Sequence, residues 1–566
     1  MEKKNKLIIL GVIILLLVAS GLTFAILTWN STMIKLGINT NCFTINYAKG
    51  NNISGSLKLI NEEDLISNGK FTIKEGVGVS GVNIGINGNC SIEGYGNIIL
   101  NITNISSAFT TGSSKGALKY AVLKNTSTIT DPTQISTTSL LNQSFDIEKK
   151  GSIDTSGTLK LLTKQLSNTE LYKYIIVIYV DNNLAGNDVT SATFQGNISA
   201  DATQGRINAD ITLNYLNSLN STITLASGTP DFTTVSGNNG TDNNGNTGLG
   251  DGTKGIYKAE DDLGTSYYFR GAVDNNYVYF AGFYWRIIRI NGDGSIRMIY
   301  AGTSAHANGE SEKDSRIGQI VYNTNYQDNG YVGYMYGNFT TPTNCSTDDN
   351  TGITTCTGGS TSYEEAHANI NDSNIKSYID NWYNNNLKDY AYAIVDTIYC
   401  NDRSITPVDN FAGMTLTGTG KGIENTAYSE LTRGYINHTP SLKCANKNDR
   451  FTVNNSIGNA KLTNPIALIT SDEVIMGGLS NYDFVNNAYI ANPDSYLTTP
   501  NYWYWTMTPF AAAGGGASVA SVRSGVLYGG YLVDNDSGGG CRPVVSLSSD
   551  AISGGKGTID DPFIVY

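Results

Sequence analysis

Charged side chains are scarce in this chain of 566 residues, at 15% of the total, whereas soluble proteins carry about 25%. Proline is also rare, with 11 residues, while glycine (62) and tyrosine (35) are abundant. This composition, poor in charged helix formers and rich in aromatic and turn residues, indicates β-structure with many turns. The chain is too long for one hydrophobic core, so we expect two or three domains.

The sequence also lacks the signatures of several function classes. No dense block of lysine and arginine occurs and the net charge is −12, which argues against nucleic acid as a partner. Neither a CxxC nor an HExxH motif is present, so zinc-ribbon and metalloprotease chemistry have no support. We therefore predict no catalytic residue, no metal ligand and no cofactor.

Only three histidines are present, His306, His367 and His438. Glu364 and Glu365 beside His367 form the least implausible acid/base group, but a solvated loop explains these residues equally well.

One long hydrophobic run stands out near the start. Residues 7–27 are 21 residues without a charge, preceded by Lys3, Lys4 and Lys6. As a helix the run would span roughly 31 Å, enough for a bilayer. The positive-inside rule then places residues 1–6 in the cytoplasm and the rest outside, as a single-pass protein of the cell membrane. The alternative is secretion after cleavage of a signal peptide near Ala25.

Seven cysteines in an exported chain suggest disulfides. By proximity we pair Cys42 with Cys90, Cys345 with Cys356, and Cys400 with Cys444, which leaves Cys541 unpaired. Six cysteines alone allow fifteen connectivities, so these pairs are hypotheses.

Residues 30–205 read as many short strands without helical periodicity, and we predict a β-sandwich. A connector (206–235), in which a short helix is one alternative, and a flexible linker (236–255) follow. Seven of the linker's twenty residues are glycine and five are asparagine. The segments "FAILTWNST" and "ATFQGNISADATQ" resemble the camelysin and biofilm-fibre group of secreted sandwich proteins.

The last domain, 256–566, opens on a predicted sheet. Its strands are 267–273, 277–280, 283–290 and 295–300, with the "NGDG" turn joining the last two. Alternation places Arg286, Arg289 and Arg297 as solvent-facing or paired residues. Further on, Ile375, Ile379, Trp382 and Leu387 recur at helical spacing after Asp372 or Ser373, either of which can cap a helix.

Two motifs near the end carry a second resemblance. "WYWTMTP" (503–509) and "GCRPVVSL" (540–547) resemble a domain of gut Firmicutes surface proteins, similar to the formylglycine-generating-enzyme version of the C-type-lectin-like fold. The resemblance implies an α+β domain with ligand contacts in its C-terminal part. There the sequence offers Arg523, Tyr528, Tyr531, Asp534 and Asp536. Trp503 and Trp505 are expected in the core, and the alternative is that one of them lines a pocket. The enzyme branch uses a pair of cysteines, and Cys541 has no neighbour in sequence.

The fold class expected is thus a multidomain chain with an N-terminal transmembrane helix, an all-β sandwich and an α+β C-type-lectin-like domain. We expect a surface-anchored extracellular binding or adhesion protein that recognises a protein or glycan without catalysis. The alternatives are an exported enzyme derived from the formylglycine-generating-enzyme fold and a structural subunit of a surface fibre.

Overall fold

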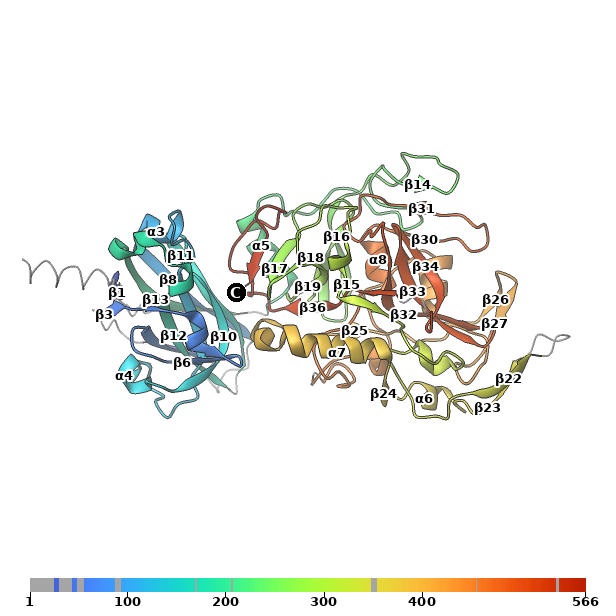
Figure 1. Cartoon of the computed structure of the whole chain (residues 1–566), viewed down its shortest axis with the longest axis horizontal. Helices are drawn as coiled ribbons and strands as arrows, with labels where there is room; N and C mark the ends of the chain where they lie inside the picture. Colours follow the sequence, from blue (N-terminus) through green and yellow to red (C-terminus); the bar gives the residue numbers. More distant parts are fainter. Residues whose placement is uncertain are drawn as a thin grey trace, which may run out of the picture. The chain divides into compact units, whose positions relative to one another are not determined.

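A computed structural model describes most of the chain (Figure 1). The described residues are 25–29, 43–47, 55–86, 93–167, 170–204, 207–347, 354–454, 456–535 and 539–565. They fall into two compact units, which divide between residues 206 and 207.

The first unit consists of two β-sheets that share one hydrophobic core. The first sheet has the strand order β11-β8-β13-β1-β3, and the second has β2-β7-β12-β9-β10-β6-β5, with β4 added on β12. The strands are β1 (Ala25–Trp29), β2 (Phe43–Tyr47), β3 (Gly55–Leu57), β4 (Leu59–Ile60), β5 (Ile66–Ser67), β6 (Lys70–Thr72), β7 (Gly78–Ile86), β8 (Gly94–Ile105), β9 (Leu118–Lys124), β10 (Ser144–Ser152), β11 (Gly157–Leu166), β12 (Leu171–Asp181) and β13 (Thr193–Gln204). The short helices are α2 (Glu62–Leu65), α3 (Ser107–Thr110) and α4 (Thr137–Leu140).

The apolar run "YIIVIYV" explains the centre of the second sheet. It forms most of β12, which lies between β7 and β9 and is buried on both faces from Tyr174 to Asp181. On one face Ile176 and Ile178 join a core that includes Leu100 and Ile198 of the opposite sheet. The predicted β-sandwich is therefore confirmed as a β-rich unit with a core between two sheets.

The predicted membrane helix is wrong at its last three residues. Ala25–Leu27 belong to β1, where Ile26 pairs in parallel with Thr193. Residues 1–24 lie outside the described part of the chain, as do Cys42 and Cys90 with their predicted disulfide. Within the part that is described, no helix is long and apolar enough to cross a bilayer.

The second unit contains two larger sheets and a few helices. One sheet has the order β15-β16-β18-β17-β37 with β19 and β36 attached, and the other has β20-β35-β32-β33-β34-β30 with β28 on β32. Their strands are β15 (Gly255–Asp261), β16 (Gly264–Arg270), β17 (Tyr277–Phe280), β18 (Phe283–Ile290), β19 (Ile296–Gly302), β20 (Gly318–Ile320), β28 (Thr426–Ala427), β30 (Ser480–Asn481), β32 (Trp503–Ala513), β33 (Gly516–Arg523), β34 (Val526–Leu532), β35 (Gly539–Cys541), β36 (Val544–Leu547) and β37 (Phe563–Val565).

Short two-stranded pairs and helices complete this unit. The pairs are β14 (Thr241–Asp242) with β31 (Ile490–Ala491), β21 (Met335–Tyr336) with β24 (Asn371–Asp372), β22 (Thr343–Thr347) with β23 (Thr354–Thr357), β25 (Tyr399–Cys400) with β29 (Arg450–Phe451), and β26 (Val408–Phe411) with β27 (Met414–Leu416). The helices are α5 (Ala209–Leu219), α6 (Tyr363–Ala366), α7 (Asn374–Asn386), α8 (Ser471–Met476) and the π-helix η7 (Leu431–Ile436).

The predicted opening sheet of this unit is confirmed. Strands β17 and β18 have the predicted limits, and the turn between β18 and β19 closes where the Asn291 N–H donates to the Ser295 carbonyl over 2.8 Å. Gly294 in that turn has φ +84°, a conformation that glycine adopts without strain. The sheet's rings pack tightly, with Trp285 perpendicular to Tyr300 at 5.5 Å between centroids.

The predicted helix is also confirmed, as α7. Ser373 caps it by accepting a hydrogen bond from the Lys376 N–H, and Ile375 and Ile379 are buried. Trp382 is half-buried, and its ring packs edge-on against that of Trp285 with 6.3 Å between the centroids. The stripe of apolar side chains therefore packs against the first sheet.

The flexible linker predicted at 236–255 is wrong, because this segment folds into the second unit. Strand β14 pairs with β31, and the Asp251 carboxylate forms an ion pair with Arg270 at 2.8 Å. Asp242 accepts hydrogen bonds from the backbone N–H groups of Asn244 and Asn246. The Asn, Asp and Gly residues thus form successive tight turns. A flexible linker would have the same composition, so composition alone does not distinguish the two. In the connector 206–235 the short-helix alternative is confirmed as α5. The second unit begins at 207 and not at 256.

Candidate functional site

Three of the predicted ligand-binding residues lie together in the second sheet. Arg523 ends β33, and Tyr528 and Tyr531 lie on the neighbouring strand β34. The Arg523 Nη1 donates a hydrogen bond to the Tyr531 hydroxyl over 2.9 Å. Asp534 is half-buried in the turn after β34, and Asp536 lies outside the described residues.

These tyrosines belong to a longer series of stacked rings, which we call the aromatic row. Tyr531 stacks on Trp503 at 4.6 Å with 12° between the planes, and Tyr528 stacks on Tyr482 at 4.4 Å with 25°. The ring centroids of Tyr528 and Tyr531 are 6.2 Å apart, and those of Tyr482 and Tyr489 are 6.0 Å apart. All five rings are half-buried, so each is anchored in the protein and still reaches solvent.

A bulge in β34 places both tyrosines on the same side of the sheet. Val519 pairs with Tyr531 and Ser521 with Tyr528, so β34 carries one residue more than β33 between these pairs. Without the bulge, residues three apart on a strand would face opposite sides. Gly529 lies within the bulge, where a Cβ would come 2.2 Å from a ring carbon of Phe510. The bulge and its glycine therefore position the row.

The surroundings of the row suit recognition. Val485 (68% exposed) and Leu532 (42% exposed) add apolar surface from the same segments. Burial, together with the charge repulsion of neighbouring tyrosines such as Tyr482, raises the pKa of Tyr528 to about 12. Its phenol therefore stays neutral and can donate or accept a hydrogen bond at physiological pH. Tyrosine, tryptophan and arginine are the residues that dominate binding energy at interfaces.

Three members of the row, Trp503, Tyr482 and Tyr489, are not among the ligand-binding residues predicted from the sequence. Trp503 was expected in the core, but it is half-buried because it begins β32, whereas Trp505 is fully buried as predicted. Tyr482 and Tyr489 lie in the turn-rich segment "NYDFVNNAYI". Two tyrosines and a phenylalanine in a segment of this kind are the sequence feature that could have indicated an aromatic surface.

The arginines of the opening sheet are paired or buried rather than exposed. Arg289 donates to Asp261 at 2.7 Å, and both Arg289 (3.0 Å) and Arg297 (2.9 Å) donate to one oxygen of Glu473. Arg286 is buried as well. The solvent-facing alternative is therefore excluded, because helix α8 covers the face on which Arg289 and Arg297 lie.

A small polar pocket opens beside this cluster. Besides Arg289 and Arg297 it is lined by Arg433, which forms ion pairs with Asp402 and Asp472, both at 2.7 Å. Since each of these guanidinium groups already has a carboxylate partner, the pocket has little charge left for a ligand. We assign this network to stabilisation of the fold.

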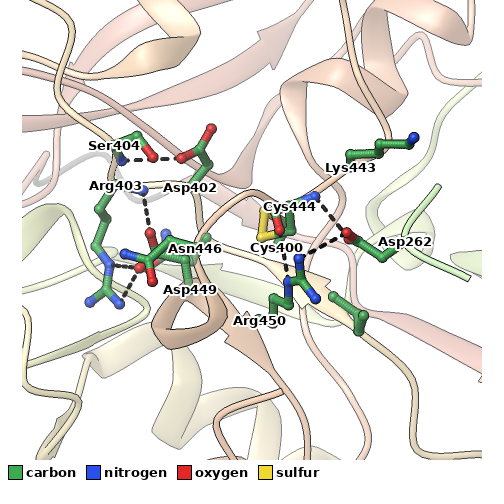
Figure 2. The surroundings of a disulfide bond; sticks show 12 residues. Asp262, Cys400, Asp402, Arg403, Ser404, Lys443, Cys444, Asn446, Asp449 and Arg450 are labelled. Carbon is green, nitrogen blue, oxygen red and sulfur yellow. Dashed lines mark hydrogen bonds and ion pairs between the residues drawn. A yellow bond between two sulfur atoms is a disulfide. The ribbon is translucent and has the colours of Figure 1, made fainter. Parts of the chain in front are cut away.

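A disulfide lies next to the network (Figure 2). Cys400 of β25 is bonded to Cys444, whose N–H donates to Asp262 over 2.8 Å. Arg450 contacts both Cys444 and Asp262. Its Nε donates to the Cys444 carbonyl over 2.7 Å, and its Nη2 lies 3.1 Å from the Asp262 carboxylate. The second disulfide, Cys345–Cys356, links β22 and β23. Both predicted pairs within the described residues are confirmed.

Loss of the Cys400–Cys444 disulfide is expected to cost about 4 kcal/mol, and loss of Cys345–Cys356 about 3 kcal/mol, by the chain-entropy model. The larger value follows because the first bond spans 44 residues and the second spans 11. Thermal denaturation of the two Cys→Ser double variants compares them directly. Equal losses, or a larger loss for Cys345–Cys356, would contradict this ranking.

The histidines form no catalytic arrangement in the described chain. His306 Nε2 lies 2.8 Å from Asp314, and the Ser304 hydroxyl approaches the same nitrogen at 3.4 Å. In a triad the base would use its two nitrogens for the two partners. His367 is fully buried, and burial holds its pKa well below the ordinary range. The Glu365 carboxylate accepts a hydrogen bond from the Thr361 N–H.

Cys541 is buried and free. Burial raises the pKa of its thiol, which disfavours the reactive thiolate. The other four described cysteines are in disulfides, and no described group of three or more His, Cys, Asp or Glu side chains could hold a metal ion.

Comparison with known proteins gives no assignment: no family model and no curated protein matches this chain.

Proposed function

We propose that this protein is an extracellular binding protein that recognises a glycan or protein ligand through the aromatic row, without catalysis. The observation that carries the proposal is the row itself. Five half-buried rings are held in place by stacking, and Arg523 and the phenol groups supply hydrogen bonds at their edges. Flat rings with polar edges suit the apolar faces and hydroxyl groups of sugars, so a glycan is the favoured ligand.

Export to an oxidising exterior is part of the proposal. Two disulfides support it, because such bonds persist outside the cytosol. Under this proposal the apolar run before β1 anchors the protein in the cell membrane or directs its secretion. The mixed sheets and helices of the second unit agree with the α+β head that the C-type-lectin-like resemblance implies.

A glycan and host-protein array probed with the full-length protein tests the function. We expect Tyr531→Ala and Tyr528→Ala each to weaken binding at least about tenfold, because central aromatic residues contribute 2 kcal/mol or more at interfaces. Arg523→Ala should weaken it less, since the arginine is exposed. Tyr279→Ala is the matched control, because Tyr279 is 37% exposed on β17 and lies outside the row.

Binding that survives Tyr528→Ala and Tyr531→Ala together would remove the aromatic row as the site. Hits confined to the host-protein half of the array would identify a protein ligand instead of a glycan.

A further inference from the structure

A second pocket in the second unit has a different character. It is a small pocket that lies beside β18, the loop around His306 and the segment just before β36. Arg286, Arg542, Tyr496, Thr498, Ser311 and Glu310 are among the residues that line it. We call it the arginine pocket.

Arg286 is a buried cation whose partners are all neutral. Its Nε donates to Asn276 Oδ1 (2.7 Å), and its Nη2 donates to the Val273 carbonyl and to Asn308 Oδ1 (both 2.8 Å). The guanidinium lies 3.7 Å from the centroid of the Tyr277 ring. Burial, with the nearby Arg542 acting in the same direction, lowers the pKa of Arg286 to about 10.

Arg542 is the second such cation. It is 3% exposed, its Nε donates to the Tyr300 carbonyl over 3.0 Å, and its guanidinium lies over the Tyr504 ring. Its Nη1 is buried and has no hydrogen-bond partner among the described residues, and the same holds for the hydroxyl of Ser311. Two residues that line the pocket therefore each carry a buried donor without a hydrogen-bond partner among the described residues.

The other buried arginines each have a carboxylate partner. Six arginines of the described chain are buried, and four of them form ion pairs: Arg270 with Asp251, Arg289 with Asp261, Arg297 with Glu473, and Arg403 with Asp449. For Arg286 and Arg542, no carboxylate of the described residues lies within ion-pair distance. Burying a cation without a counter-ion is costly, and here two such cations line one pocket.

Glu310 is the one carboxylate among the residues that line the pocket, and it does not fill this role. It is exposed, and its carboxylate accepts a hydrogen bond from the Ala307 N–H at 3.3 Å. Asp314, on the same loop, is bound to His306 and to the Ser304 and Thr303 hydroxyls, which together hold its pKa at about 2 against the effect of burial. Both acids thus have partners away from the two arginines.

We propose that the arginine pocket binds the oxyanion of a small acidic ligand, a carboxylate or a phosphate group, through Arg286 and Arg542. Guanidinium groups recognise both oxyanions by charge-assisted hydrogen bonds. Arg542 Nη1 and the Ser311 hydroxyl are buried donors without a partner among the described residues, and both residues line the pocket. This inference does not depend on the aromatic row.

Calorimetric titration of the full-length protein tests the proposal with three probes at matched ionic strength: inorganic phosphate, glucuronate, and glucose as the uncharged control. We expect saturable binding of phosphate, glucuronate or both, with one site per chain, and none of glucose. Binding of phosphate alone identifies a phosphate site, and binding of glucuronate alone identifies a carboxylate site. No saturable binding of either anion would overturn the proposal.

Two variants locate the site. Arg542→Gln should weaken anion binding at least about tenfold, because it removes one of the two charges. Glu310→Gln should strengthen binding several-fold, because it removes a repelling charge at the pocket, and it serves as the test if Arg542→Gln fails to fold. Anion affinity that is unchanged in Glu310→Gln, or in a folded Arg542→Gln, would contradict the assignment.

Discussion

Replacing Glu473 by glutamine is expected to destabilise the second unit by about 3–5 kcal/mol, the usual cost of breaking a buried ion pair from one side. The Glu473 carboxylate is 2% exposed and accepts hydrogen bonds from both Arg289 and Arg297. It also completes the capping box of α8 with Thr470. Glutamine keeps the shape of the side chain but leaves Arg289 with Asp261 as its remaining carboxylate and leaves Arg297 without a carboxylate among the described residues. Chemical denaturation of the full-length protein measures the loss.

The exposed Glu260 on β15 provides the matched control. Its carboxylate bonds only the Thr265 hydroxyl, so Glu260→Gln should change stability by less than about 0.5 kcal/mol. A Glu473→Gln variant as stable as Glu260→Gln would refute the view that this ion cluster holds the sheet and α8 together.

The same carboxylate predicts a pH dependence. Arg297 and Arg289, acting against burial, hold the pKa of Glu473 at about 2, below its ordinary 4.5. A lowered pKa contributes stability that is fully present above about 4.5 and is lost as pH falls towards 2. The stability difference between wild type and Glu473→Gln should therefore shrink over this window. A difference that stays constant from pH 5 to pH 2.5 would contradict the assignment.

Replacing Trp285 by alanine is expected to cost about 3–5 kcal/mol through lost burial and the cavity left behind. Trp285 is fully buried and packs against Phe280, Tyr300 and Trp382. Its indole N–H also donates to the Phe280 carbonyl at 3.1 Å, a bond that alanine cannot make. Thermal or chemical denaturation reports the change.

Two companion variants calibrate that result. Trp382→Ala, at a half-buried position in the same cluster, should cost less, and Tyr279→Ala on β17 should cost least, because Tyr279 is 37% exposed. The order Trp285, Trp382, Tyr279 is the prediction, and a reversed order would show that the cluster is not the centre of this core.

Local patterns predicted the local structure well. The limits of β17 and β18, the turn at 291–294 and helix α7 all follow from alternation, turn residues and helical spacing. Such features depend on residues that are neighbours in sequence. The two described disulfides were likewise predicted because their cysteines lie close together in the sequence.

Features set by distant partners were predicted poorly. The segment 236–255 has the composition of a linker, and only its pairing with β31 and the ion pair to Arg270 show that it is folded. Sequence alternation predicted Arg289 and Arg297 as solvent-facing or paired but did not reveal that Glu473 is their shared partner, 184 and 176 residues later.

In the candidate site, too, residues close in sequence were predicted and residues brought in from distant segments were missed. Arg523, Tyr528 and Tyr531 were predicted because they lie in one short stretch, and the structure brings the three together. Tyr482 was missed because it reaches Tyr528 only through the parallel pairing of β30 with β34. The arginine pocket joins Arg286 and Arg542 across more than 250 residues, a distance over which no sequence motif operates.

The most direct test of the account is hydroxyl-radical footprinting of the full-length protein with and without the ligand found on the array. We predict that bound ligand slows the oxidation of Trp503, Tyr528 and Tyr531, while the exposed Tyr279 reacts at an unchanged rate. Saturating ligand that leaves all three residues as reactive as before, while other surface positions become protected, would contradict recognition by the aromatic row.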